Sequence, residues 1–111
     1  MIVSEKIYFA FDSFELTAES RSILDRKAEV LKGTPDLRVL VEGHCDERGT
    51  NEYNLALGER RARAVQKYLI LLGVDPSQME IISYGEERPD DMGHSEGAWA
   101  KNRRSEFETV W

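Results

Sequence analysis

Hydrophobic and polar residues follow different spacings in different segments of the chain, and each spacing predicts an element. Alternation with a period of two predicts strands at residues 6–11, 80–84 and 105–111. A nearly continuous apolar run at residues 37–43 predicts a strand that is buried on both faces. These four segments are the expected strands of one sheet.

Apolar residues at helical spacing predict two long helices between these strands. The first follows Thr17, whose hydroxyl group can cap it, and it stops at residues 33–36, which read Gly-Thr-Pro-Asp. The second covers residues 52–72. Shorter helical turns are expected at residues 75–77 and near Trp99. The buried stripes of the two long helices are expected to consist of Ile23, Leu24, Ala28 and Leu31, and of Leu57, Val65, Tyr68, Leu69 and Leu72.

The order of the elements is strand, helix, strand, helix, strand, loop, strand. Helical crossovers between the first three strands favour parallel or non-adjacent pairing with right-handed connections. We therefore predict an α+β fold of two layers, with a mixed four-stranded sheet and two main helices packed on one face. Residues 1–111 are expected to form one domain, with a core of about residues 6–111.

Composition excludes several classes of function. The 111 residues carry 15 Lys and Arg against 21 Asp and Glu, a net charge of −6 that argues against a general nucleic-acid binder. With Cys45 as the single cysteine, neither an internal disulfide nor a thiolate zinc cage can form, and no cofactor is expected. The longest apolar run, residues 68–72, is far shorter than the ~20 residues of a membrane span. No leader is visible at Met1, so any export signal or anchor is expected outside this sequence.

The second long helix carries the clearest candidate site. Asn54, Leu57 and Arg61 are three and four residues apart, so they project from one face. An arginine near the positive end of a helix dipole is disfavoured by about 0.3–1 kcal/mol, which favours an anion beside it. Asp46, in the loop before the helix, is the obvious candidate. An Asp beside an Arg can form a plain ion pair, or it can bind a zwitterion whose carboxylate is held by the guanidinium group.

Several segments resemble, in the correct order, the signature of the outer-membrane-protein-A-like (OmpA-like) peptidoglycan-binding domains. Residues 43–46 read Gly-His-Cys-Asp, and residues 53–62 contain Tyr-Asn, Leu-Gly and Arg-Ala. The family pattern is G-H-T-D, a short loop, and then N-x-x-L-S-x-x-R-A. Residues 8–13, 84–89 and 99–104 are similar to the first strand, third strand and final element of the family. The resemblance covers about residues 6–111 and implies the OmpA-like fold.

The resemblance also implies a ligand. Asp46 and Arg61 occupy the positions that hold the diaminopimelate residue of the peptidoglycan stem peptide, and the loop at residues 12–14 matches the segment that closes over it. Two positions depart from the pattern, because Cys45 replaces the usual Thr and Gly58 replaces the usual Ser. The expected ligand-binding residues are Asp12, Ser13, Phe14, Cys45, Asp46, Asn54, Leu57 and Arg61.

The function implied by the resemblance is non-catalytic binding that tethers the outer membrane to the cell wall. The segment at residues 93–96, before Asn102, is most similar to the lipoprotein branch of the family. That branch implies a lipid anchor upstream of this sequence, a position on the periplasmic side of the outer membrane, and partners in the Tol system, especially TolB. Nucleic acid is not an expected partner.

Three alternatives remain open from the residues alone. His44 and Cys45 could serve a small hydrolase, although adjacent residues that leave a strand point in different directions. A metal could be bound by Glu42, His44 and Asp46 with His94, but a hydrogen-bonded structural histidine is the preferred reading of His44. The same domain could also belong to a flagellar stator subunit or to the tail of a barrel protein.

Overall fold

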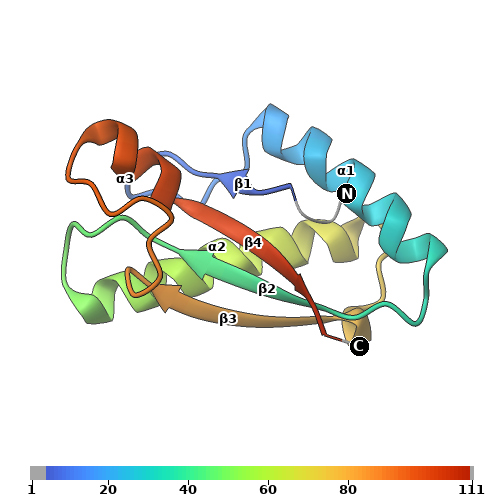
Figure 1. The fold of residues 1–111 in the computed structure, drawn as a ribbon. Helices are drawn as coiled ribbons and strands as arrows, with labels where there is room; N and C mark the ends of the chain where they lie inside the picture. The colour runs from blue at the N-terminus through green and yellow to red at the C-terminus, as the bar shows by residue number, and fades with distance from the viewer. Residues whose placement is uncertain (1–4, 111) are drawn as a thin grey trace.

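The structure is a computed structural model that describes residues 5–110. Its elements match the predicted order, and the short helical turns expected at residues 75–77 and near Trp99 are confirmed as η2 and α3 (Figure 1). In chain order they are β1 (Ile7–Tyr8), α1 (Ala18–Gly33), β2 (Val39–His44), α2 (Asn51–Leu71), η2 (Pro76–Gln78), β3 (Met79–Gly85), α3 (Glu96–Asn102) and β4 (Arg104–Thr109).

Side-chain caps fix where the helices begin. The hydroxyl oxygen of Thr17 accepts a hydrogen bond from the backbone N–H of Ser20 at 3.0 Å, which confirms the cap predicted for α1. Thr50 caps α2 in the same way, and Ser95 caps α3. Gly73, with a φ of 100°, follows the end of α2 in the left-handed conformation that glycine adopts without strain.

The four strands form one mixed sheet in the order β1-β4-β2-β3. Strands β2 and β3 are parallel, whereas β4 is antiparallel to both β1 and β2. The predicted fold class is confirmed. The first strand is shorter than predicted, because the carbonyl oxygen of Ala10 accepts a hydrogen bond from Arg61 and the chain turns at Asp12, whose φ is 52°.

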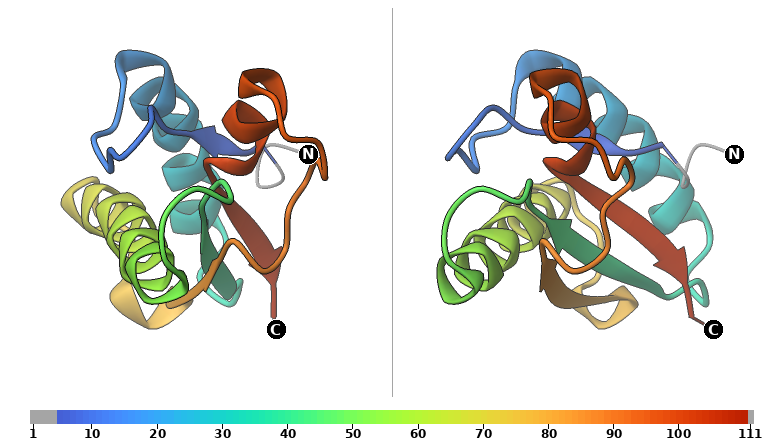
Figure 2. Two further views of the ribbon diagram at one scale, coloured as in Figure 1. Left: turned by 90° about the vertical axis from the view of Figure 1, so that its left-hand side faces the viewer. Right: turned by 60° about the vertical axis from the view of Figure 1, so that its left-hand side comes forward.

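The hydrophobic core lies between the sheet and the two long helices, which share one face of it (Figure 2). Val39 and Val41 of β2 point into this layer and are fully buried. Of the stripes predicted from helical spacing, Leu24, Ala28, Leu31, Leu57, Val65 and Leu69 are buried, whereas Ile23, Tyr68 and Leu72 are partly buried against the core. Within residues 5–110, no helix has the length and apolar character needed to cross a membrane.

Helix α2 approaches β2 closely because two glycines face each other. A Cβ atom built on Gly43 would lie 1.7 Å from the carbonyl oxygen of Gly58. A Cβ atom on Gly58 would lie 2.2 Å from Oγ of Ser83 in β3. Only residues without a side chain allow this contact, and it holds the middle of α2 against the carboxyl end of β2.

Candidate functional site

A cleft of about 180 Å³ opens at the end of the molecule where β2 leads into α2 and where the chain leaves β1, on the left of Figure 1. Most of its wall comes from the loop after β2 and from the first part of α2. Its lining residues are Phe11, Asp12, Cys45, Asp46, Arg48, Gly49, Tyr53, Asn54, Leu57 and Arg61.

The structure brings most of the predicted site residues together. The cleft is lined by Asp12, Cys45, Asp46, Asn54, Leu57 and Arg61. Ser13 adjoins it through its backbone, since its carbonyl oxygen accepts a hydrogen bond from Nε of Arg61 at 2.8 Å. Phe14 lies elsewhere and lines a shallow groove with Leu16 and Tyr68. The side chain of Phe14 is half exposed.

Arg61 is buried, with 1% of its surface exposed, and its guanidinium group is held by backbone carbonyl oxygens. Nη1 donates to His44 at 2.9 Å, and Nη2 donates to Ala10 at 3.1 Å, in addition to the bond from Nε to Ser13. Burial lowers the pKa of Arg61 from its usual value. The predicted role of the helix dipole is wrong, because Arg61 lies ten residues after Asn51 in a 21-residue helix and the dipole acts only within the first turn.

Asp46 is also buried, and two arginines other than Arg61 pair with it. Arg48 forms a two-point contact, from Nε to Oδ1 at 3.2 Å and from Nη2 to Oδ2 at 2.8 Å, and its backbone N–H also donates to Oδ1. Nη1 of Arg103 lies 3.4 Å from Oδ2. Burial alone would raise the pKa of Asp46, but the hydrogen bonds from Arg48 and Arg103 leave it below the usual value. Asp46 is therefore a carboxylate at neutral pH.

Arg48 is the main functional candidate that sequence reasoning missed. Its guanidinium carbon lies 3.9 Å from the centre of the Phe11 ring and 4.3 Å from that of the Trp99 ring, so it is stacked between them at the edge of the cleft. A usable signal was present, because an Asp side chain often accepts from the backbone N–H two residues later. The stack joins the loop after β1, the loop after β2 and α3, and no local sequence pattern indicates that these segments meet. Gly49 and Tyr53 were missed as well.

Neutral polar groups complete the wall. Nδ2 of Asn54 donates to Oε1 of Glu86 at 2.7 Å, which fixes the amide group at the cleft. The thiol of Cys45 donates to the carbonyl oxygen of Asn54 at 3.2 Å, and burial raises the pKa of this thiol to about 11. The hydroxyl group of Tyr53 donates a short hydrogen bond to Asp12. The cleft thus combines two carboxylates and two guanidinium groups with a partly apolar wall.

The histidines are engaged away from this cleft. Nε2 of His44 lies 2.9 Å from Oε1 of Glu42, which confirms a hydrogen-bonded structural histidine. Burial lowers the pKa of His44 to about 4, so the ring is neutral at neutral pH. Nδ1 of His94 instead contacts Glu47 at 2.7 Å. Among residues 5–110, no three His, Cys, Asp or Glu side chains gather in a way that could hold a metal ion.

Comparison with known sequences gives a consistent family assignment. The sequence profile of the OmpA family matches residues 8–103. The peptidoglycan-associated lipoprotein of Pseudomonas aeruginosa is 58% identical over 100 residues, which are 90% of this chain and 59% of that protein. The chain therefore spans about three fifths of the length of that curated relative.

Solved structures agree with the sequence matches. The crystal structure of the peptidoglycan-associated lipoprotein from Burkholderia pseudomallei superposes with a TM-score of 0.92 and 46% identity, covering 95% of this chain and 89% of the other. The C-terminal domain of Helicobacter pylori MotB gives a TM-score of 0.89 at 26% identity, covering 96% and 84%. The resemblance predicted from residues 43–46 and 53–62, including its lipoprotein branch, is confirmed.

Proposed function

This chain belongs to the OmpA family, and on that premise we propose that it binds peptidoglycan without catalysis, through the diaminopimelate residue of the stem peptide. The side chain of diaminopimelate ends in one carbon that carries both an ammonium and a carboxylate group. A receptor for it needs an anion and a cation a few ångströms apart. Asp46 and Arg61 line one open cleft, and this single observation carries the proposal.

The cation for the ligand carboxylate is Arg61. A guanidinium group has five N–H donors, and three of those of Arg61 donate to backbone carbonyl oxygens. Those bonds orient the planar group, and the remaining donors can form a two-point contact with a carboxylate. Because the group is buried, its interaction with a ligand charge is weakened little by solvent.

The anion for the ligand ammonium is Asp46. Arg48 and Arg103 keep this carboxylate ionised and orient it, so a ligand ammonium adds a third cation around it. The short hydrogen bond of Tyr53 orients the second carboxylate, Asp12, at the same cleft. Each charge-assisted hydrogen bond contributes ~1.5–3 kcal/mol at best.

The proposed site discriminates between two types of cell wall. Lysine at the same stem position has the ammonium group but lacks the carboxylate beside it. Bound lysine would leave the buried guanidinium group of Arg61 without a carboxylate partner. A buried polar group that is left unpaired costs more free energy than a small loss of apolar contact, so the site is expected to bind lysine more weakly.

Substitutions in the cleft test this function against neighbouring controls. We expect Asp46→Asn and Arg61→Lys each to reduce co-sedimentation with insoluble diaminopimelate-type peptidoglycan at least about tenfold, since each removes a charge-assisted contact. Arg60→Lys, at the adjacent exposed position, is the matched control and should bind as the wild type does. Circular dichroism checks that each variant is folded. Wild-type retention by both cleft variants would contradict the assignment.

The similarity to peptidoglycan-associated lipoproteins supports a proposal for the anchor, the location and the partners of the full-length protein. We propose that the full-length protein carries a lipid anchor upstream of this sequence and stands on the periplasmic side of the outer membrane. It would then tether that membrane to the wall, and local concentration would support weak binding by each module. We also propose TolB and other Tol-system proteins as its partners. Capture of purified TolB by the full-length protein tests this, and a lack of capture at micromolar concentrations would count against it.

Catalysis by His44 and Cys45 gains no support from their contacts. The thiol of Cys45 donates to Asn54, and its raised pKa keeps it protonated at neutral pH. Nε2 of His44 is hydrogen-bonded to Glu42, and the thiol is hydrogen-bonded to Asn54 instead of the ring. We expect Cys45→Ser to leave retention on peptidoglycan unchanged, and peptidoglycan cleavage that this variant abolishes would favour the hydrolase.

A further inference from the structure

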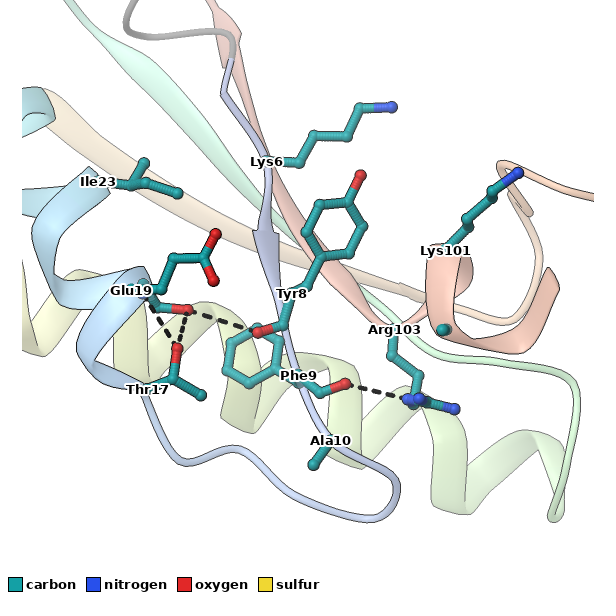
Figure 3. Close-up of a pocket in the computed structure, with 11 residues that line it drawn as sticks. Lys6, Tyr8, Phe9, Ala10, Thr17, Glu19, Ile23, Lys101 and Arg103 are labelled. Atoms are coloured by element: carbon teal, nitrogen blue, oxygen red, sulfur yellow. Dashed lines mark hydrogen bonds between the residues drawn. The ribbon is translucent and has the colours of Figure 1, made fainter. Parts of the chain in front are cut away.

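A groove of about 380 Å³ lies behind the candidate cleft, between α1, β1 and α3 (Figure 3). Thr17, Glu19 and Ile23 lie on the α1 side, and Lys101 and Arg103 on the other. Arg103 lines this groove, whereas its guanidinium group reaches Asp46, which lines the cleft. Arg103 thus lies between the groove and the cleft.

The guanidinium group of Arg103 joins three elements around the cleft. Nε donates to the carbonyl oxygen of Phe9 at 3.0 Å, drawn as the dashed line between these two residues in Figure 3. Nη1 donates to Oδ2 of Asp46 at 3.4 Å, and Nη2 donates to Oε1 of Glu96 in α3 at 3.1 Å. Only 7% of the residue is exposed. Solvent screens the bonds to Phe9 and Asp46 little, because those partners are buried, whereas the bond to Glu96 is a partly exposed ion pair.

These bonds connect the anion of the cleft with its cation. The residue after Phe9 is Ala10, and the carbonyl oxygen of Ala10 accepts from Nη2 of Arg61. Arg103 therefore holds Asp46 on one side and the backbone segment that holds Arg61 on the other.

We propose that Arg103 is a positioning residue for peptidoglycan binding, which sets the separation of Asp46 and Arg61 from behind the cleft. This inference rests on the function proposed above. Arg103 contacts no ligand in this account, and its effect on binding is exerted through Asp46 and through the backbone at Phe9.

Arg103→Ala tests the inference, with Arg104→Ala as the matched control. Arg104 is the next residue and is equally buried, but it donates to the carbonyl oxygen of Arg88 and to Glu106, away from the cleft. We expect Arg103→Ala to weaken binding of isolated meso-diaminopimelate by about tenfold or more in calorimetry, because a displaced Asp46 loses its charge-assisted contact with the ligand ammonium. Arg104→Ala should bind as the wild type does once both proteins are verified as folded.

Two further readouts separate positioning from a general loss of structure. Carboxyl-carbon NMR should show a higher pKa for Asp46 in Arg103→Ala, because the carboxylate loses one of its cations, but not in Arg104→Ala. Ethylguanidinium should restore diaminopimelate binding to Arg103→Ala, since the vacated space adjoins a groove that is open to solvent. If Arg103→Ala does not fold, Arg103→Lys should bind more weakly while the pKa of Asp46 stays near the wild-type value.

The outcomes are distinct. Wild-type affinity in Arg103→Ala, or the same loss of affinity in Arg104→Ala, would overturn the role of Arg103. If wild-type protein gives no binding heat with meso-diaminopimelate, the proposed function fails. The pKa of Asp46 in the two variants then still decides whether Arg103 holds that carboxylate.

Discussion

Gly43→Ala is expected to damage both stability and binding, because the contact between Gly43 and Gly58 fixes α2 against the sheet. The added Cβ atom would lie 1.7 Å from the carbonyl oxygen of Gly58, 2.5 Å from its carbonyl carbon and 3.0 Å from its Cα. All three atoms are backbone atoms, so no rotation of a side chain can relieve the overlap. The strand or the helix has to move.

The size of the effect follows from these distances. Because Cβ atoms essentially never approach closer than 3.0 Å, the 1.7 Å contact requires a displacement of at least about 1.3 Å. Overpacking of this kind costs about 1–3 kcal/mol, and we expect the upper end because backbone must move. Arg61 lies one turn after Gly58, so the displacement also moves its guanidinium group relative to Asp46.

Urea unfolding followed by circular dichroism measures this loss, with Gly33→Ala as the control. Nothing lies within 4 Å of a Cβ atom on Gly33, at the end of α1, so that substitution should be neutral or stabilise by up to about 1 kcal/mol. A Gly43→Ala protein with the wild-type midpoint and slope would refute the close-contact argument. Folded Gly43→Ala should also bind meso-diaminopimelate more weakly than the wild type.

Substitutions at three further positions test stability elsewhere. Burial and the neighbouring carboxylates, including Glu106, raise the pKa of Glu42 to about 7. The stabilising effect of its protonated form is complete below about pH 4.5 and is lost as the pH rises through 7. Relative to the wild type, the free energy of unfolding of Glu42→Gln should therefore rise by about 2–3 kcal/mol between pH 5 and 8 in urea unfolding. Gln78→Leu should lose about 2–3 kcal/mol, because the two amide hydrogens of Gln78 are shared among three backbone carbonyl oxygens within 3.1 Å. An unchanged melting temperature would count against this. Thr17→Ala should lower the free energy of unfolding by about 1 kcal/mol, because it removes the hydroxyl group that caps α1. Thr17→Ser keeps a capping hydroxyl group and should keep the wild-type stability in the same thermal unfolding experiment.

The fold could be predicted because its signals are local. Helical spacing and the caps at Thr17 and after Leu71 determine α1 and α2 almost to the residue. The first strand was predicted as residues 6–11 because alternation continues through Phe11. Its ladder ends at Tyr8 because the backbone beyond it bonds to arginines from other elements, at Phe9 to Arg103 and at Ala10 to Arg61.

The candidate site could be predicted in part, for a similar reason. Family motifs and helical spacing brought Asp46, Asn54 and Arg61 together, and the structure places all three at one cleft. The same reasoning expected Asp46 to be the partner of Arg61, whereas Arg48 and Arg103 pair with it. These pairings depend on how separate segments meet in three dimensions, which spacing along one helix does not reveal.

Calorimetric titration of the wild-type protein with isolated meso-diaminopimelate, and in parallel with lysine blocked at its α-groups as Nα-acetyl-lysine amide, tests the central claim most directly. The two ligands share the terminal ammonium group and differ in the carboxylate that Arg61 is expected to bind. The account predicts saturable binding of diaminopimelate and affinity for the blocked lysine that is at least about tenfold weaker. Equal affinity for the two, or no binding of diaminopimelate, would contradict it.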